Sequence, residues 1–472
     1  MLVETKDKRI GKVFSYFEEI SKIPRISGIR EPIANYLVEF AKARGLEYII
    51  DRDCNVVIKK PCSKGLESRP TVILQGHTDI VADKTPCCPL DLTKDGLRLY
   101  CDGDFLKAEG TTLGADNGVA VAYMLAILDS DDIPHPNIEA VFTSDEEIGL
   151  LGAEAIDAKC LTGRYLINID SDEEGVFTVG CAGGMISEAT LEISKAEEVK
   201  DVYRLVVNGL VGGHSGTEIT KCRMNAIKIL AEILSDISGI EISEISGGNA
   251  DNAIPRYAEA TLYLPSVSRA QSVVSTVKDK YIGAEPAINI SIEPLPQKKN
   301  VISPVDSIKI IDFITKMPTG VYKMSVDFPD LPETSLNLGI LDYDGERVKL
   351  SFCVRSSKDD EKRTLANKIS EICREFGASY REHGLYPAWE YKKDSNLRDT
   401  MVKIYKERYG ESPKVITIHA GLECGIFTKK IPNVECISIG PNAYDGHTTD
   451  ERLSIKSTAR TFEYLLAVLE NI

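Results

Sequence analysis

The sequence predicts an α/β protein in which a mostly parallel β-sheet, covered by helices, is interrupted by an inserted α+β domain. Three observations predict this fold. Strand-like apolar runs alternate with helical patterns up to about residue 180, longer and more polar strands follow from about 185 to 390, and the first pattern then returns. We therefore expect a main domain in two parts, residues 1–185 and 391–472, around an inserted domain at 186–390.

The main domain is expected to begin with two amphipathic helices, at about 8–22 and 30–44, the second of which ends at Gly45. Four strands should follow, with an apolar helix between the second and the third. After residue 390 a helix, a strand and a final helix complete the domain. The expected strands of the main domain after these two helices are 55–60, 71–75, 138–144, 165–169 and 434–440. The expected helices are 118–128, 396–409 and one from about 455.

The inserted domain contains two pairs in which a strand precedes a helix. The first pair is the strand 202–211 with the helix 225–237, and the second is the strand 347–356 with the helix 362–376. Their similarity predicts two related α+β halves, although no strict sequence repeat is visible.

Composition and charge exclude several classes of protein. The chain has 472 residues, too many for one ordinary core, and its net charge of −16 opposes binding to nucleic acid or to an anionic membrane. No apolar run is long enough for a membrane span, and the charged N-terminal residues do not resemble a signal peptide, so we expect a cytoplasmic protein. The 12 cysteines form no CxxC pair, which favours reduced thiols.

Acidic residues and histidines follow the expected strands. His77 and Asp79 follow the second strand, Asp145, Glu146 and Glu147 the third, and Asp170 the fourth, while the segment 445–451 (DGHTTDE) follows the strand 434–440. Ligands of open α/β sheets bind beyond the carboxyl ends of the strands, so these segments should meet at one place. Asp116, at the start of the apolar helix, is either a fifth contributor or a plain helix cap.

Histidines and carboxylates in this number indicate a metal site. Such nitrogen and oxygen ligands suit zinc, with cobalt or manganese as alternatives. The carboxylates exceed the needs of one zinc ion. Two cations that share one carboxylate would hold a bridging water and would offset the repulsion among the acidic groups.

The motifs HTD, GTTLGADNG, FTSDEEIGLLGA, INIDSDEEG, CAGG, GGHSG, NAIP, HAGLECGIF and DGHTTDE, in order between about residues 70 and 455, resemble those of the aminoacyl-histidine dipeptidases. These enzymes, also called Xaa-His or beta-alanyl-histidine dipeptidases, belong to a dizinc metallopeptidase group that includes carnosinases and aminoacylases. The resemblance implies a catalytic domain with an inserted lid, two Zn²⁺ ions per chain and a small peptide substrate. HTDIVADK departs slightly from the pattern expected after the first ligand.

The resemblance also implies roles for individual residues of the catalytic domain. His77, Asp116 and Asp170 would hold one zinc ion, and Asp116, Glu147 and His447 the other, so that Asp116 is the bridge. Glu146 would be the general base, and Asp79 would orient the His77 imidazole. A cis peptide bond between Asp116 and Asn117 is a further feature of the group.

In the lid, the resemblance implies that His214 stabilises the oxyanion and that Asn252 and Arg355 contact the substrate. Gly421, in the second part of the main domain, belongs to the motif HAGLECG and could let the backbone approach the substrate. Arg355 would bind the free carboxylate of a dipeptide. The glycines around His214 could instead simply shape a tight loop, and Arg355 could be an ordinary surface ion-pair residue. His419 and Glu423 receive no role from the sequence.

We therefore expect metal-dependent hydrolysis of dipeptides, including Xaa-His, by a water that bridges two zinc ions. An aminoacylase or a tripeptidase on the same scaffold is the alternative function. A non-catalytic metal-dependent binding protein is a third, disfavoured by the complete set of ligands with Glu146 and His214. In relatives with a short lid the oxyanion histidine can come from a partner chain, whereas a duplicated lid could supply it within one chain. The lid expected here, residues 186–390, is long enough for either arrangement, and a homodimer is expected.

Overall fold

The computed structural model describes residues 2–194 and 198–472, which form two compact units. Unit 1 comprises the described residues up to Cys181 together with Trp389–Thr417 and Leu422–Ile472. Unit 2 comprises the described residues of Ala182–Ala388 and the short segment Ile418–Gly421.

An eight-stranded sheet forms the centre of unit 1, with the strand order β1-β2-β6-β3-β7-β23-β8-β22. The neighbours β6 and β3, β3 and β7, and β7 and β23 pair in parallel, whereas β1, β2 and β8 join the sheet in antiparallel pairs. The predicted parallel character is therefore confirmed for the central strands. The strands are β1 (Glu47–Ile50), β2 (Val56–Lys60), β3 (Val72–His77), β6 (Ile138–Thr143), β7 (Tyr165–Asn168), β8 (Val176–Cys181), β22 (Lys414–Ile418) and β23 (Glu435–Ser438).

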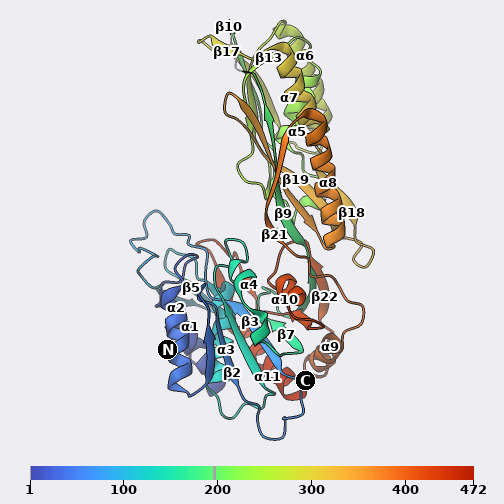
Figure 1. Cartoon of the computed structure of the whole chain (residues 1–472). Coiled ribbons are helices and arrows are strands. Elements are labelled where there is room, and N and C mark those ends of the chain that lie inside the picture. The colour runs from blue at the N-terminus through green and yellow to red at the C-terminus, as the bar shows by residue number, and fades with distance from the viewer. Residues whose placement is uncertain (1, 195–197) are drawn as a thin grey trace. The chain divides into compact units, whose positions relative to one another are not determined.

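Helices cover this sheet, as Figure 1 shows. The helix α3 (Ala115–Leu128) packs against both β3 and α1 (Lys8–Ile20), and almost all of its residues are buried. A helix that is apolar on all sides is suited to such a position inside a domain. The remaining α-helices of unit 1 are α2 (Glu31–Ala43), α4 (Leu151–Ala155), α9 (Asn396–Tyr409), α10 (Cys424–Lys430) and α11 (Ile455–Asn471).

A second, four-stranded sheet of unit 1 was not predicted from the sequence. Its strand order is β24-β25-β5-β4, and its strands are β4 (Leu99–Asp102), β5 (Phe105–Ala108), β24 (Ala443–Tyr444) and β25 (Arg452–Ser454). The segment 445–451 is the loop between β24 and β25, which pair in antiparallel register. This sheet therefore fixes both ends of the loop that contains His447.

Unit 2 is built on a nine-stranded sheet in which two halves share one topology. The path is β16-β11-β15-β13-β19-β20-β9-β21, with β18 (Gly320–Met324) paired to β19. The first half has the chain order β11-α5-β13-β15-α6-β16, and the second β9-α7-β19-β20-α8-β21. If the four strands of each half are numbered along the chain, both halves have the spatial order 4-1-3-2.

The elements of the first half are β11 (Tyr203–Asn208), α5 (Ala226–Ser235), β13 (Glu241–Gly247), β15 (Ala258–Tyr263), α6 (Val267–Tyr281) and β16 (Asn289–Pro294). Those of the second half are β9 (Gly183–Glu192), α7 (Pro304–Lys316), β19 (Pro332–Tyr343), β20 (Arg347–Ser356), α8 (Asp359–Phe376) and β21 (Ser379–Tyr386). Four short strands of the described part of unit 2 lie outside the nine-stranded sheet: β10 (Glu198–Lys200) pairs with β17 (Lys299–Val301), and β12 (Gly213–His214) pairs with β14 (Ala253–Ile254).

The two related halves predicted from the sequence are therefore present, but the strand–helix pairs that suggested them are not equivalent. The pair β11 and α5 opens the first half, whereas β20 and α8 are the third strand and second helix of the other. The first strand of the second half, β9, precedes the entire first half in the chain. This separation explains why no repeat is visible in the sequence.

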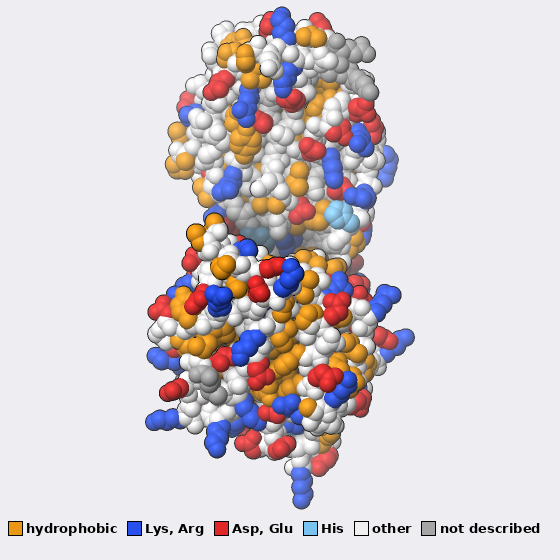
Figure 2. All heavy atoms as spheres, turned by 90° about the vertical axis from the view of Figure 1, so that its left-hand side faces the viewer, with side chains coloured by type: hydrophobic (Ala, Val, Ile, Leu, Met, Phe, Trp, Pro, Cys, Tyr) orange, Lys and Arg blue, Asp and Glu red, His pale blue; other side chains and the backbone are white. Residues whose placement is uncertain are grey.

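On the faces of both units drawn in Figure 2, acidic and basic side chains are interspersed, as is usual for a surface in contact with water. All 12 cysteines are free thiols, as the sequence predicts. Within residues 2–194 and 198–472, no helix is both long and apolar enough to cross a membrane.

Candidate metal centre

The strands of unit 1 bring four separate segments to one edge of the sheet. His77 is the last residue of β3, Glu146 and Glu147 follow β6, and Asp170 follows β7. Because these three strands are parallel neighbours, their carboxyl ends lie together. His447 reaches the same place from the loop between β24 and β25.

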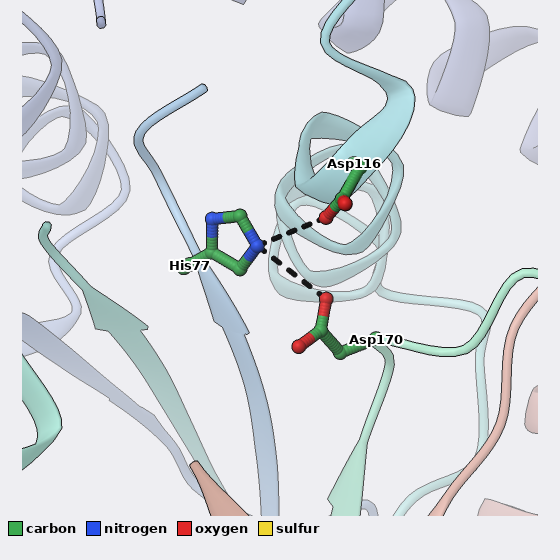
Figure 3. Close-up of side chains that lie close together, drawn as sticks. All are labelled: His77, Asp116 and Asp170. Carbon is green, nitrogen blue, oxygen red and sulfur yellow. Dashed lines mark hydrogen bonds and ion pairs between the residues drawn. The ribbon is translucent and has the colours of Figure 1, made fainter. Parts of the chain in front are cut away.

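The first group of side chains surrounds the His77 imidazole, which is 1% exposed. His77 Nε2 lies 3.0 Å from Asp116 Oδ1 and 3.4 Å from Asp170 Oδ1. Figure 3 shows both carboxylates directed at this nitrogen. Although burial opposes protonation, the carboxylates of Asp170, Asp116 and Asp79 raise the pKa of His77 well above its ordinary value.

The second group surrounds the imidazole of His447. His447 Nε2 lies 3.2 Å from Asp116 Oδ2 and 3.0 Å from Glu147 Oε1. Hydrogen bonds to Asp116 and Glu147 raise the pKa of His447 to about 11. The two oxygens of Asp116 therefore face different histidines, one in each group.

The geometry of both groups fits a divalent cation. In His77, Asp116 and Asp170, and likewise in Asp116, Glu147 and His447, one ligand atom from each residue lies within 4.8 Å of the others. Imidazole nitrogens with carboxylate oxygens are a donor set that suits zinc. Burial raises the pKa of Asp170 to about 7, which shows how poorly this place accommodates negative charge without a compensating cation.

Glu146 is also near this centre. Its Oε2 lies 3.9 Å from His77 Nε2, farther than the oxygens of Asp116 and Asp170. His77, Glu146 and Glu147 form a third group within the same 4.8 Å limit, so geometry alone allows Glu146 to act as a ligand. Because its carboxylate lies farther from His77 Nε2 than those of Asp116 and Asp170, Glu146 is better placed to act next to a bound cation than to be one of its ligands.

The Asp79 carboxylate connects His77 to the loop that contains both glutamates. It accepts hydrogen bonds from the backbone N–H groups of Glu146 (3.0 Å) and Glu147 (3.2 Å) and from the Ser27 hydroxyl (2.8 Å). His77 Nδ1 lies 3.0 Å from the Asp79 backbone carbonyl and 3.5 Å from its carboxylate. The carbonyl is therefore the nearer partner of the imidazole, and the carboxylate chiefly fixes the glutamate loop.

Asp145, the first residue of the run of three carboxylates, faces away from the ligands. It is fully buried and forms an ion pair with Arg30, while its Oδ1 accepts a hydrogen bond from the backbone N–H of Gly28 at 2.7 Å. The three acidic residues in sequence therefore have different surroundings, and Asp145 anchors their loop to the N-terminal segment.

Asn117 joins the ends of two strands that contribute ligands. Its Oδ1 accepts a hydrogen bond from the backbone N–H of His77 at 3.2 Å, and its Nδ2 donates to the carbonyl of Ile169 at 2.5 Å. The expected cis bond between Asp116 and Asn117 is present. The Asp116 carboxylate oxygens contact the His77 and His447 imidazoles, which favours a place in the ligand groups over the interpretation of Asp116 as a plain helix cap.

Glu451 holds the loop that precedes Asp116, a role that the sequence did not indicate. Its buried carboxylate accepts hydrogen bonds from the backbone N–H groups of Leu113 (2.7 Å), Gly114 (2.8 Å), Ala115 (2.8 Å) and Asp116 (3.3 Å). Its position in the segment 445–451, four residues after His447, is the signal that could have identified it.

The buried Arg25 supports the same loop from another side. It donates hydrogen bonds to the carbonyls of Gly114 (2.7 Å) and Thr78 (3.0 Å). Gly114 has φ of 66°, and a Cβ there would lie 2.8 Å from Arg25 Nη2, so glycine is required. No pattern in the sequence distinguishes Arg25 from a surface arginine.

Glu423 lies buried beneath the metal centre. Its Oε2 accepts hydrogen bonds from Gln75 Nε2 and, at 2.8 Å, from Thr143 Oγ1, and Gln75 Oε1 accepts one from Asn168 at 2.6 Å. Burial raises the pKa of Glu423 to about 8. Gln75, Thr143 and Asn168 belong to β3, β6 and β7, so this network links the strands that position the ligands.

In unit 2, His214 belongs to the short strand β12 (Gly213–His214), which pairs with β14. Its Nδ1 accepts hydrogen bonds from the backbone N–H groups of Gly216 and Thr217, each at 3.3 Å. The carbonyl of Asn252 accepts one from the backbone N–H of Ser215 at 2.8 Å. Asn252 and His214 are therefore neighbours within unit 2.

Arg355 is a buried residue of β20 and not a surface ion-pair residue. It is 7% exposed, donates a hydrogen bond to the Tyr386 hydroxyl at 3.0 Å, and its Nε has no partner. A side chain at Gly421 would meet the ring of Tyr386, so Gly421 lies beside the same tyrosine. Among the described residues, no carboxylate forms an ion pair with Arg355.

Comparison with known proteins shows that the chain belongs to the peptidase family M20/M25/M40, whose model matches residues 73–471. This membership confirms the predicted enzyme class, a metallopeptidase with an α/β fold.

Two relatives match nearly the whole chain. The cytosol non-specific dipeptidase of Escherichia coli K12 is 33% identical over 472 residues, which cover 98% of this chain and 97% of that protein. The crystal structure of the aminoacylhistidine dipeptidase from Vibrio alginolyticus superimposes with a TM-score of 0.87 at 33% identity, over 98% of this chain and 96% of that one. The resemblance noted in the sequence is thereby confirmed. An aminopeptidase of Bacillus cereus, at 16% identity and a TM-score of 0.59 over 98% of both chains, shares the fold.

The contacts of Glu451 lead to a first prediction. Glu451→Gln places an amide N–H₂ group against backbone N–H donors, so the loop before Asp116 should loosen. We expect zinc affinity to fall by about 10–100-fold, as is typical for groups that support metal ligands. A competition titration with a chromophoric chelator measures the affinity, and thermal unfolding of the metal-free protein shows whether the substitution also lowers the stability of the fold.

Asp450→Asn is the matched control, because it removes the same charge from the neighbouring exposed residue. A Glu451→Gln variant that bound zinc as tightly as Asp450→Asn would show that Glu451 does not position Asp116.

Proposed function

We propose that this chain is a metal-dependent dipeptidase whose substrates include Xaa-His dipeptides such as beta-alanyl-histidine. The observation that carries the proposal is the pair of ligand groups that share Asp116. The dipeptidase names of two relatives that match nearly the whole chain support the choice of substrate. The name of the first also supports a cytoplasmic location.

The proposed cofactors are two Zn²⁺ ions per chain, with Co²⁺ or Mn²⁺ as alternatives. His77, Asp116 and Asp170 would hold one ion, and Asp116, Glu147 and His447 the other. When bound, two such cations would polarise both a water molecule and the scissile carbonyl.

Glu146 is proposed as the general base. It would take a proton from the attacking water and return it to the leaving amine. Asp79 would keep Glu146 in place, because its carboxylate binds the backbone N–H of that residue at 3.0 Å. Neither residue needs to bind a cation for this task.

His214 is proposed to donate a hydrogen bond to the oxyanion. Burial and the neighbouring Arg355 lower the pKa of His214, which favours the neutral ring. Since Nδ1 accepts two backbone hydrogen bonds, the proton of that ring belongs on Nε2. An N–H donor of fixed direction is suited to a charge that develops only in the transition state.

Arg355 is proposed to bind the free carboxylate of the dipeptide, with Asn252 and Gly421 as further substrate contacts. A buried guanidinium without an acidic partner is costly unless a ligand supplies the negative charge. Arginine can meet a carboxylate with two parallel hydrogen bonds. The absence of an ion pair at Arg355 among the described residues therefore supports this role.

An aminoacylase or a tripeptidase on the same scaffold is the alternative. Assays of carnosine and Gly-His beside an N-acetyl amino acid and a tripeptide separate these activities, because an aminoacylase would prefer the N-acetyl substrate. A homodimer is also proposed, and analytical ultracentrifugation tests it.

A second prediction tests the proposed division between base and ligand. Glu146→Gln should keep two zinc ions per chain and lose several orders of magnitude in kcat, because only proton transfer is removed. Asp116→Ala should lose metal as well as activity, since both groups share this residue. Inductively coupled plasma mass spectrometry and steady-state kinetics measure the two effects. Equal loss of zinc from both variants would contradict the assignment of Glu146 as base.

A third prediction separates His214 from Arg355. His214→Ala should lower kcat by about 10²–10³ with little change in KM or zinc content, because the hydrogen bond forms in the transition state. Arg355→Ala should instead raise KM for free dipeptides, since a carboxylate is also bound in the ground state.

C-terminally amidated dipeptides test the carboxylate contact directly. Wild-type protein should cleave Gly-His amide poorly, and Arg355→Ala should lose little further activity on it. Equal cleavage of free and amidated dipeptides by the wild-type protein would exclude the carboxylate contact and favour a general aminopeptidase.

A further inference from the structure

Three buried side chains of unit 2 each have a polar atom without a partner in hydrogen-bond geometry, although the Cys353 thiol lies close to two of these side chains and the Pro332 backbone close to the third. The three atoms are Arg355 Nε, His419 Nδ1 and Ser215 Oγ, on residues that are 7%, 2% and 1% exposed. A buried polar group without a partner is destabilising, and its retention in a fold points to a ligand that completes it. Arg355 already has a proposed ligand, whereas His419 and Ser215 have none.

These side chains belong to one neighbourhood. Arg355 on β20 is paired in register with Ser335 on β19, and Ser335 Oγ lies 2.7 Å from His419 Nε2. Ser215 precedes Gly216, where an added Cβ would lie 2.6 Å from the backbone carbonyl of His419. The segment Ile418–Gly421 thus places His419 between the strand pair and the loop after His214.

The His419 imidazole can offer a hydrogen-bond donor here. The Ser335 hydroxyl can donate to Nε2, which leaves the proton of a neutral ring on Nδ1. Burial and the nearby Arg355 guanidinium lower the pKa of His419 to about 3, so the ring stays neutral at physiological pH. Arg355 Nε, His419 Nδ1 and Ser215 Oγ can therefore all donate hydrogen bonds.

Because all three groups are hydrogen-bond donors, they favour a ligand that offers only acceptors. Carboxylate oxygens accept hydrogen bonds and donate none, so a carboxylate can satisfy all three groups. A C-terminal amide would turn an N–H₂ group toward at least one donor and leave that donor unpaired. A neutral imidazole beside Arg355 adds a donor without the repulsion of a second positive charge.

We infer that His419 is a second residue that binds the free C-terminal carboxylate of the substrate, beside Arg355, through Nδ1–H. This inference rests on the proposed dipeptidase function and deepens it, because it names the group that distinguishes a free dipeptide from its amide. Ser335 is the positioning residue that fixes the orientation of the His419 ring.

Two substitutions of His419 test the roles of its two ring nitrogens separately. The side-chain amide of asparagine can replace a donor at Nδ1, whereas that of glutamine reaches the position of Nε2 and leaves Nδ1 without a substitute. His419→Gln should raise KM for Gly-His about tenfold, the usual effect of losing one hydrogen bond to a charged group, with little change in kcat. His419→Asn should retain most of the affinity.

The amide of Gly-His provides the control reaction, since His419→Gln should leave its cleavage unchanged relative to wild type. Zinc content should be wild-type in both variants. The matched control protein is His383→Gln, the same change at an exposed histidine of β21 in the same unit. Ser335→Ala, which removes only a hydroxyl, should give a smaller increase in KM that is again restricted to the free dipeptide.

Thermal unfolding of each variant shows whether it is folded, and Ser335→Ala carries the test if either His419 variant is not. The inference would be overturned if His419→Gln raised KM equally for Gly-His and its amide. It would also be overturned if His419→Asn raised KM for Gly-His more than His419→Gln does. If Arg355→Ala removes the discrimination against the amide while His419→Gln and Ser335→Ala keep it, this inference fails and the proposed function stands. A zinc-loaded wild-type protein that cleaves no dipeptide would overturn both.

Discussion

Repulsion among carboxylates is the constraint on which the organisation of unit 1 depends. Asp116, Glu147 and Asp170 lie at one edge of the sheet with Glu146 beside them, and such a cluster is stable only if positive charge balances it. Hydrogen bonds to Asp116 and Glu147 raise the pKa of His447, and burial raises that of Asp170, so both shifts favour added positive charge at this place. Two divalent ions would supply this charge, so the site is suited to bind metal and to release protons as it does so.

The fold supports this cluster mainly through backbone contacts made by neighbouring polar side chains. Asp79 binds the N–H groups of the glutamate loop, Glu451 binds those of the loop before Asp116, and Asn117 joins the ends of β3 and β7. Beneath them, Glu423 links three strands through buried side chains. Each ligand segment is thus held by a residue from a distant part of the chain, which is the arrangement expected of a preorganised site.

The sequence predicted those features that depend on local patterns. The central strands were recognisable because apolar runs end in acidic residues or histidine, and parallel strands then bring His77, Glu147 and Asp170 together. The small sheet was missed because its strands are two to four residues long and partly exposed. The equivalence of the two halves of unit 2 was hidden because β9 is separated in the chain from the rest of its half. Glu451, Arg25 and His419 act through contacts between distant segments, and no local pattern reports such contacts.

The central claim is that two cations share Asp116. X-ray diffraction from zinc-loaded crystals, measured on both sides of the zinc absorption edge, tests it most directly. We expect two anomalous peaks per chain, each within ordinary zinc–oxygen distance, about 2.0–2.2 Å, of a different oxygen of the Asp116 carboxylate. A single peak, or two peaks of which one has no contact with Asp116, would contradict it.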